Sequence, residues 1–183
     1  MNKAEFRSEM RRIASAADAE SVASENAEIE KKLIKILSGY RCVFIYVSSG
    51  REIPTICIIE KLLSAGVRVC VPKTHDGCTM DAVEIKGLEE LEVRRYNIPE
   101  PTGTDIVPPE DISAAVVPGL AFGRDFTRLG KGKGYYDRFL KRAGNAVRIA
   151  PCRKMCLADS VPHEPHDELM NVIITKDEIL KDR

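Results

Sequence analysis

The sequence predicts an α/β fold in which helices cover both faces of a mostly parallel sheet. Two observations carry this prediction. Short, continuously apolar segments rich in β-branched residues recur along the chain, and such segments suit strands that are buried on both faces. Segments with apolar residues at helical spacing alternate with them, as in the strand–helix–strand units of parallel sheets. A length of 183 residues, 44% of them hydrophobic, suits one domain over residues 1–183.

The N-terminal part of the chain predicts two helices, over residues 2–18 and 21–38. In the first helix, Phe6, Met10 and Ile13 fall on one face. In the second helix, the apolar residues repeat with the same spacing. Each helix therefore has one apolar side that can pack against another element.

The next segment predicts a strand, a helix and a second strand in succession. Residues 42–47, CVFIYV, form a continuous run of β-formers and predict a buried strand. Pro54 suits the first turn of a helix, and Gly66 can end that helix. Residues 67–72, VRVCVP, predict the second strand. This order implies a parallel pair with a right-handed crossover.

The rest of the chain predicts further strands, two loops and one helix. Residues 96–110 contain four prolines and predict an ordered loop. Residues 120–132 predict a long polar loop, which leads into a helix over residues 134–144. Further strands are predicted over residues 79–85, 114–119, 147–151 and 171–175. Together these elements predict a Rossmann-like, three-layer sandwich.

The charge balance argues against two classes of partner. The chain has 28 basic and 28 acidic residues, so its formal net charge is zero. General binders of nucleic acid or of membrane surfaces carry a large basic excess, so we expect neither partner. The N-terminus, MNKAEFRSEMRRI, has no apolar signal core, and no apolar run approaches the ~20 residues that span a bilayer. We therefore expect a cytoplasmic protein, either a monomer or a weak homodimer.

Six cysteines occur, at positions 42, 57, 70, 78, 152 and 156. The first three lie in apolar stretches, and we expect no signal peptide. Cytosolic thiols stay reduced, and cysteine packs as a small hydrophobic residue. We therefore expect reduced core thiols rather than disulfides.

The strongest functional signal is RLGKGKGYYD, Arg128 to Asp137, which follows a predicted buried strand and opens a helix. Its three glycines allow positive φ angles and let backbone N–H groups approach a ligand closely. Arg128, Lys131 and Lys133 add positive charge beside a helix N-terminus, a combination that suits a polyphosphate. The spacing matches neither a Walker A loop nor the dinucleotide fingerprint. The alternative is a solvated glycine-rich turn with incidental lysines.

Asp137 lies in the first turn of that helix and allows two interpretations. It could complement the helix dipole or pair with Lys141 at i+4. It could instead hold a Mg²⁺ ion that also contacts the phosphates. The spacing leaves both interpretations open.

These residues resemble those of the 5-formyltetrahydrofolate cyclo-ligase family, whose members are also called methenyltetrahydrofolate synthetases. The core of the resemblance is VPGLAF over residues 117–122 and RLGKGKGYYDRFL over residues 128–140. Supporting matches are Lys3, Arg7, REIPT (51–55), YNIPEP (96–101) and HDELMNVIIT (166–175). The resemblance runs over nearly the whole chain and implies an α/β protein.

The resemblance implies an enzyme that uses ATP and Mg²⁺. Members of the family convert 5-formyltetrahydrofolate to 5,10-methenyltetrahydrofolate and release ADP and phosphate. The resemblance implies that the formyl oxygen is phosphorylated first, that N10 of the folate then closes the ring, and that phosphate leaves. Phosphorylation turns a poor leaving group into a good one, so the protein would mainly position the reactants and stabilise charge.

The resemblance also implies site residues. The positions that would bind ATP are Lys3, Arg7, Arg128, Leu129, Gly130, Lys131, Gly132, Lys133, Gly134, Tyr135 and Tyr136. The positions that would bind the folate are Val47, Glu52, Tyr96, Lys131, Gly132, Lys133, Gly134 and Tyr135. The catalytic candidates are Arg128, Lys133 and Tyr135, and the metal-binding candidates are Asp137 and Asp167.

Most of these residues also have an ordinary structural interpretation. Lys3 and Arg7, at i and i+4, could lie on a solvated helix face. Glu52 could be an exposed loop charge. Val47 and Tyr96 could serve packing alone.

The chain departs from the family pattern at four positions. Gly123 stands where members usually have Asp, and Phe126 stands where they have Gly. Cys152 and Met155 replace an aromatic residue and a glutamine. We therefore expect the loop before residue 128 to bend differently. These departures leave the ATP and metal positions intact and bear on substrate fit and rate.

Three other functions stay open at this stage. The first is a zinc site built from Cys152, Cys156, His163 and His166, although the central spacer is shorter than in the usual finger. The second is a family-like protein that binds a nucleotide or folate with weak or no turnover. The third is a different ATP-dependent enzyme on the same scaffold, since fold does not fix function.

Overall fold

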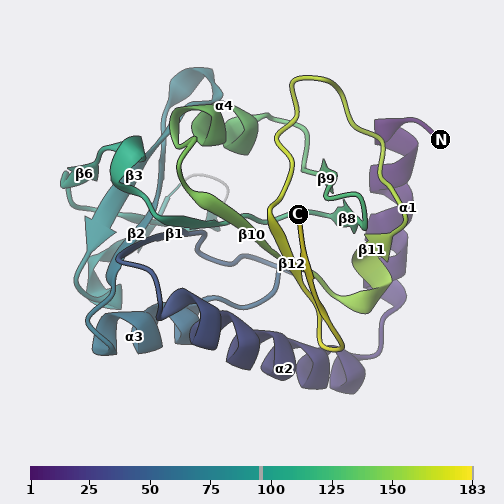
Figure 1. Cartoon of the computed structure of the whole chain (residues 1–183), viewed down its shortest axis with the longest axis horizontal. Helices are drawn as coiled ribbons and strands as arrows, with labels where there is room; N and C mark the ends of the chain where they lie inside the picture. Colours follow the sequence, from purple (N-terminus) through teal and green to yellow (C-terminus); the bar gives the residue numbers. More distant parts are fainter. Residues whose placement is uncertain (95–96, 183) are drawn as a thin grey trace.

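A computed structural model describes residues 1–94 and 97–182, and its main element is one eight-stranded sheet (Figure 1). In spatial order the strands are β13 (Ile179–Lys181), β12 (Val172–Ile174), β10 (Val147–Pro151), β7 (Ala114–Val116), β1 (Cys42–Ile45), β2 (Arg68–Thr74), β3 (Met80–Ile85) and β6 (Ile106–Val107). The strands from β12 to β2 run parallel to their neighbours. Those at the two edges pair antiparallel. The predicted mostly parallel sheet is confirmed.

Helices cover both faces of this sheet, as Figure 1 shows, and the predicted three layers are confirmed. Helices α2 (Ala19–Leu37) and α3 (Ile56–Ser64) lie on one face, and α4 (Tyr135–Arg142) lies on the other. Side chains of β1 alternate between the two faces. Val43 and Ile45 belong to the core under α2 and α3, whereas Phe44 stacks on Phe139 of α4 at a centroid distance of 4.3 Å. This alternation explains why the strand reads as a continuous apolar run.

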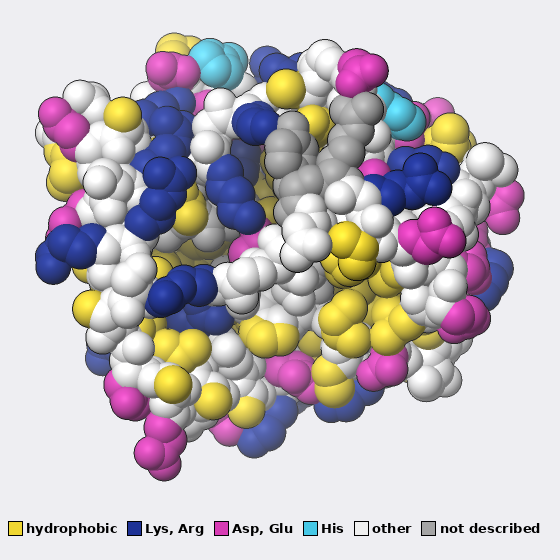
Figure 2. Space-filling view, turned by 180° about the vertical axis from the view of Figure 1, so that it is seen from behind, with side chains coloured by type: hydrophobic (Ala, Val, Ile, Leu, Met, Phe, Trp, Pro, Cys, Tyr) yellow, Lys and Arg dark blue, Asp and Glu magenta, His cyan; other side chains and the backbone are white. Residues whose placement is uncertain are grey.

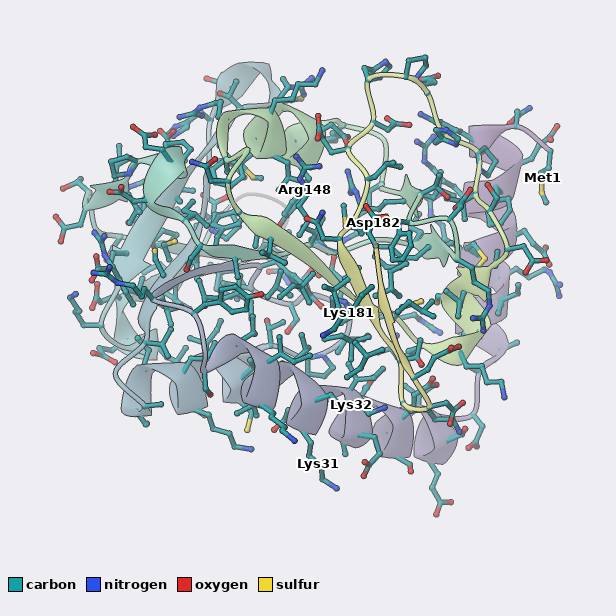
Figure 3. The ribbon with its side chains drawn as sticks, viewed as in Figure 1. Met1, Lys31, Lys32, Arg148, Lys181 and Asp182 are labelled. Carbon is teal, nitrogen blue, oxygen red and sulfur yellow. The ribbon has the colours of Figure 1, made fainter. Side chains whose placement is uncertain are left out.

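Helix α2 is also tied to the far edge of the sheet. The Lys32 ammonium group donates hydrogen bonds to the carbonyl oxygens of Thr175 and Lys176, at 2.9 and 2.5 Å. Figure 3 shows Lys32 reaching from the helix toward the turn between β12 and β13. The helix is thereby fixed by polar contacts as well as by its buried face.

The first helix, α1 (Lys3–Ala16), lies beside the main sheet and packs on a small sheet in the order β11–β8–β9 (Figure 1). These strands are β11 (Leu157–Ala158), β8 (Ala121–Gly123) and β9 (Arg128–Leu129). Met10, from the predicted apolar face, is buried against Leu129 and Val161. Asn2 caps the helix and forms a capping box with Glu5. This packing places the start of α1 against the segment that follows β9.

The sequence prediction missed several short elements. The predicted loop over residues 96–110 contains β5 (Pro99–Pro101), which pairs with β4 (Leu91–Val93), and it also contains β6. The predicted loop over residues 120–132 contains β8 and β9, and β13 was not predicted. Strands of two or three residues show no periodicity, so only their pairing partners define them. Short 3₁₀ turns are η1 (Asp76–Cys78), η2 (Leu88–Glu90), η4 (Pro109–Asp111) and η5 (Lys154–Cys156).

The start of α3 also differs from the prediction. Pro54 precedes the helix, which begins at Ile56, and Thr55 is its N-cap residue. The Thr55 hydroxyl does not cap the helix; it donates to the carbonyl oxygen of Tyr46 at 2.7 Å and so ties the helix start to the end of β1. Gly66 ends the helix as predicted, with a φ of 75°.

All six cysteines are free thiols, as predicted. Cys42 and Cys70 are buried in the core, whereas Cys57 is half-buried. None of the helices in the described part of the chain is both long and apolar enough to span a membrane.

Candidate active site

A cavity of about 850 Å³ lies beyond the carboxyl ends of three adjacent parallel strands. Tyr46 follows β1, Thr74 ends β2 and Pro118 follows β7, and all three line it. In open α/β sheets, ligands bind at this edge. Figure 2 shows a hollow with Lys and Arg side chains around its rim and hydrophobic side chains inside.

The cavity gathers the residues that the family resemblance singled out. Those that line it are Lys3, Arg7, Val47, Glu52, the ten residues from Arg128 to Asp137, and Asp167. Tyr96 lies outside the described residues. The fold thus brings to one place side chains from α1, from two loops and from the C-terminal part of the chain.

The loop from residue 130 to residue 134 is shaped by glycine and by α1. Gly132 and Gly134 have φ angles of 101° and 69°, which L side chains rarely adopt. A Cβ atom at Gly132 would lie 3.2 Å from Cζ of Arg7. The Arg7 Nε group donates a hydrogen bond to the Gly130 carbonyl oxygen at 2.9 Å. Gly132 and Gly134 are therefore required for the backbone conformation of the loop, and Gly132 also leaves room for Arg7.

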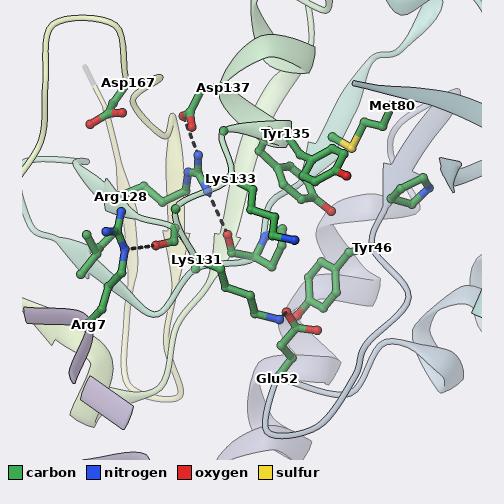
Figure 4. A pocket seen from close by; sticks show the side chains of 18 of the residues that line it. Arg7, Tyr46, Glu52, Met80, Arg128, Lys131, Lys133, Tyr135, Asp137 and Asp167 are labelled. Atoms are coloured by element: carbon green, nitrogen blue, oxygen red, sulfur yellow. Dashed lines mark hydrogen bonds and ion pairs between the residues drawn. The ribbon is translucent and has the colours of Figure 1, made fainter. Parts of the chain in front are cut away.

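Arg128 is a buried cation at the base of this loop. Only 6% of Arg128 is exposed. Its Nη2 group donates a hydrogen bond to Asp137 Oδ1 at 2.6 Å, and its Nη1 group donates one to the Pro118 carbonyl oxygen at 3.3 Å (Figure 4). The guanidinium carbon lies 5.8 Å from the centre of the Tyr136 ring. Burial raises the pKa of the Tyr136 phenol, with Glu52 adding to the effect, so the ring stays neutral. Arg128 thus offers a positive charge that is fixed in place before any ligand binds.

Asp137 pairs with Arg128 at 2.6 Å. The i+4 pair with Lys141, one of the interpretations that the sequence left open, is not formed within the described residues. The tertiary contact wins because Arg128 is nearly buried, and a charge in that position requires a partner. The backbone N–H of Glu168 also donates to Asp137 Oδ1, at 3.4 Å.

Asp167 forms a second ion pair nearby. The Lys3 ammonium lies 2.6 Å from Asp167 Oδ2 and 3.1 Å from Glu164 Oε2. Burial opposes both charges, but the hydrogen bonds and charge interactions outweigh it: the pKa of Lys3 is raised and that of Asp167 is lowered. Both groups of the pair are therefore ionised at neutral pH.

The chemistry of these carboxylates fits Mg²⁺. Asp137 and Asp167 lie on the same side of the cavity (Figure 4). Among the described residues, hydrogen bonds use Oδ1 of Asp137 and Oδ2 of Asp167, which leaves the other oxygen of each for a cation. Mg²⁺ prefers such hard oxygen ligands and keeps few from the protein. Glu164 and His166 lie beside Asp167, with ligand atoms within 4.8 Å of one another.

Glu52 is held on the opposite side of the cavity from these carboxylates (Figure 4). It forms an ion pair with Lys131 at 2.6 Å, and its second oxygen accepts a hydrogen bond from the Ser49 backbone N–H at 2.9 Å. The neighbouring Tyr46 hydroxyl is buried and donates to the Ile53 carbonyl oxygen at 2.9 Å. Glu52 is thus a positioned side chain rather than a free loop charge.

Several cavity residues were not predicted from the sequence. They are Tyr46, Pro72, Thr74, Met80, Ile98, Pro99 and Glu100. Pro72, Met80, Ile98 and Pro99, which lie around the Thr74–Glu100 hydrogen bond, form an apolar end of the cavity. The string YNIPEP holds three of the unpredicted residues, and its quoted match to the family was the one signal that could have found them. The others come from strand ends, where no local pattern marks a lining residue.

The departures from the family pattern lie away from this cavity. Gly123, Phe126 and Met155 are absent from the described lining of this cavity and of a smaller one, of about 440 Å³, beside it. Cys152 lines the smaller cavity. Phe126, where the family has glycine, takes a φ of 66° and packs on the core. A left-handed conformation at this residue costs about 1 kcal/mol, which its packing can offset.

The zinc alternative is not supported by the structure. Cys152 and Cys156 line the smaller cavity, whereas His166 lies beside Glu164 and Asp167. Among residues 1–94 and 97–182, the one group of three or more candidate ligands is Glu164, His166 and Asp167, without cysteine. Burial also raises the pKa of both thiols, which disfavours the thiolate that zinc requires.

A model of the 5-formyltetrahydrofolate cyclo-ligase family matches residues 1–176. The chain belongs to this family. The match spans both α1 and the segment after β12, so it includes every element that lines the larger cavity.

Individual family members agree with this assignment. The 5-formyltetrahydrofolate cyclo-ligase of Mycolicibacterium smegmatis is 33% identical, over 76% of this chain and 75% of its own. A probable 5-formyltetrahydrofolate cyclo-ligase of Schizosaccharomyces pombe is 25% identical, over 86% of this chain and 87% of its own. The solved structure of Aquifex aeolicus 5,10-methenyltetrahydrofolate synthetase has a TM-score of 0.88 at 24% identity, covering 99% of this chain and 93% of that one. This last likeness confirms the fold.

Proposed function

We propose that this member of the cyclo-ligase family converts 5-formyltetrahydrofolate to 5,10-methenyltetrahydrofolate. The reaction would consume ATP, require Mg²⁺, and release ADP and phosphate. One observation carries the proposal. A single cavity gathers every described residue that the resemblance assigns to ATP, folate and metal. These residues come from segments as far apart as Lys3 and Asp167, which touch at 2.6 Å.

The two ends of the cavity suit two different substrates. Arg7, Arg128, Lys131 and Lys133 surround the glycine loop, and this basic end suits the triphosphate of ATP. Met80 and its apolar neighbours lie at the other end, which suits a flat heterocycle. In Figure 4, Lys133 and Tyr135 lie between Arg128 and Met80, where the two substrates would meet.

In the proposed reaction, the formyl oxygen attacks the γ-phosphorus of ATP, and the bond from that phosphorus to the bridging oxygen of ADP breaks. N10 then attacks the formyl carbon and loses its proton. The carbon–oxygen bond breaks next, and phosphate leaves. Arg128 and Lys133 would stabilise the phosphoryl oxygens, and Arg128 is already held rigidly for this role. Tyr135 would orient the reacting groups.

Asp137 and Asp167 would hold the Mg²⁺ ion through their remaining oxygens. When bound, the ion would neutralise charge on the phosphates of ATP. Lys3 helps to lower the pKa of Asp167 and so keeps it ionised, and Arg128 orients the Asp137 carboxylate.

The direct test mixes the purified protein with 5-formyltetrahydrofolate, ATP and Mg²⁺ and follows the near-ultraviolet absorbance of the methenyl product. A rise that requires all three components supports the proposal. Binding of both substrates without product would instead support the non-catalytic alternative. ATP-dependent product formation from another phosphoryl acceptor, but not from the folate, would support a different ATP-dependent enzyme.

A pair of lysine variants tests the role of the loop. Lys133→Ala should lower kcat at least about a hundredfold, because a phosphoryl charge contact is lost. Lys141→Ala removes the same charge from an exposed position eight residues later, outside the cavity lining, and should leave the rate unchanged. Equal rates for the two variants would contradict the role of Lys133.

A further inference from the structure

The apolar end of the larger cavity contains a carboxylate that the proposed reaction does not use. Glu100 lies on β5, is 5% exposed and lines the cavity. Its Oε1 atom accepts a hydrogen bond from the Thr74 hydroxyl at 2.5 Å. Thr74 ends β2 and is the register partner of Met80 on β3. Thr74, at the end of β2, therefore holds this carboxylate in position.

The Glu100 carboxylate has few polar partners in the described part of the chain. Among the described residues, Thr74 is its hydrogen-bond donor, and no Lys, Arg or His forms an ion pair with it. A buried carboxylate costs free energy unless donors or a cation offset its lost hydration. No hydrogen bond to its second oxygen, Oε2, is found among the described residues, and Glu100 lines the cavity. The carboxylate can therefore accept hydrogen bonds from a ligand.

The surroundings restrict which ligand this can be. Pro72, Met80, Ile98 and Pro99 line the cavity around Glu100 and present apolar surface. Figure 4 shows Met80 on the opposite side of the cavity from Arg7 and Asp167. An apolar slot that ends in a carboxylate fits a flat ring whose edge carries neighbouring N–H donors.

We propose that Glu100 recognises the 2-amino-4-oxopyrimidine edge of the substrate's pterin ring. This inference rests on the proposed function, which supplies a substrate with that edge. N3–H and the 2-amino group point the same way and match the two carboxylate oxygens, as a guanidinium group does. The Thr74 hydroxyl uses one lone pair of Oε1 and leaves the others for the ligand.

The same arrangement gives specificity between the two substrates. Adenine offers a ring-nitrogen acceptor next to its amino group, and an acceptor facing a carboxylate is unfavourable. Glu100 therefore favours the pterin over the base of ATP at this end of the cavity. ATP is left to the basic end, where Arg7 and the glycine loop meet.

The test replaces Glu100 by Gln, which keeps the shape but places an amide donor against the donors of the ligand. We expect KM and the dissociation constant for 5-formyltetrahydrofolate to rise about tenfold to a hundredfold, with KM for ATP changed less than about twofold. Glu92→Gln is the matched control. Glu92 is the register partner of Glu100 on β4, but its side chain is 66% exposed, and both constants should stay at the wild-type values.

A substrate analogue supplies a readout that misfolding alone would not change. The wild type should bind 2-desamino-2-methyl-5-formyltetrahydrofolate about tenfold more weakly than the natural compound, and in Glu100→Gln this preference should fall below about threefold. If Glu100→Gln does not fold, as judged by circular dichroism, Thr74→Val serves in its place. It should raise the folate KM a few-fold, because the Thr74 hydroxyl would no longer fix the orientation of the Glu100 carboxylate.

The outcomes separate this inference from the proposed function. A wild-type protein that turns over the substrate, with a folate KM unchanged in Glu100→Gln, would overturn the inference and leave the proposed function standing. A wild-type protein that neither binds nor converts the folate would overturn both. Equal binding of the analogue and the natural compound by the wild type would also overturn the inference.

Discussion

Replacing Arg128 by Met tests whether the phosphate loop is built on a buried ion pair. The side chains of Arg128 and Asp137 are 5% and 19% exposed and lie 2.6 Å apart, so solvent screens their interaction little. Removing one partner of such a pair costs about 3–5 kcal/mol, because the other charge is left buried and alone. Because Asp137 keeps some exposure, we expect the lower end of this range. For a chain of this length, about 3 kcal/mol lowers the melting temperature by about 6–12 °C.

The assay is thermal and urea unfolding followed by circular dichroism, since the chain has no Trp to report by fluorescence. Asp137→Asn and the double variant complete a thermodynamic cycle. The summed losses in unfolding free energy of the two single variants should exceed the loss of the double variant by at least about 1 kcal/mol. Arg124→Met removes an arginine from an exposed pair with Glu178, at 2.6 Å, and should cost less than about 1 kcal/mol. A similarly small loss for Arg128→Met, or losses that simply add, would refute the reasoning.

Three further predictions follow from the same geometry. Gly132→Ala should raise KM for ATP about tenfold with little change in fold, because a φ of 101° strains an alanine and the new Cβ crowds Arg7. Steady-state kinetics at varied ATP would measure this change, and an unchanged KM would argue against the close approach of Arg7 to the loop. Asp167→Asn should raise the Mg²⁺ concentration needed for half-maximal rate, and an unchanged Mg²⁺ titration would leave the residue as the partner of Lys3 alone. Burial raises the pKa of the Cys156 thiol, so its rate of alkylation should increase about tenfold per pH unit through pH 9, and a plateau below that pH would contradict the raised pKa.

The larger elements could be predicted from the sequence because their signals are local. The strand over residues 147–151 was predicted to the residue, and both N-terminal helices were placed within two residues of their observed starts. Continuous apolar runs and helical spacing arise from burial of one or both faces of an element, so each pattern lies within the element itself. The motif from Arg128 to Asp137 is equally local, and it located the cavity.

The short strands could not be found in this way. β8 and β9 are three and two residues long, and each is defined by its pairing with the other. The same holds for β5, whose two prolines argue against a strand until β4 pairs with it. Their existence depends on how distant or irregular segments meet, and no periodicity in two or three residues records that.

The layered α/β fold and the glycine-rich basic loop could be inferred from the sequence, and the family motifs named the candidate site residues. How those residues are held could be learned only from the contacts between elements. Arg7 reaches Gly130 across 123 positions of sequence, and Asp137 pairs with Arg128 rather than with Lys141 on its own helix. The proposed role of Glu100 depends on the placement of β5 beside the end of β2, which the sequence did not indicate. Spacing records which side chains can share an element, whereas burial and packing between elements decide which charges are desolvated and therefore which must be paired.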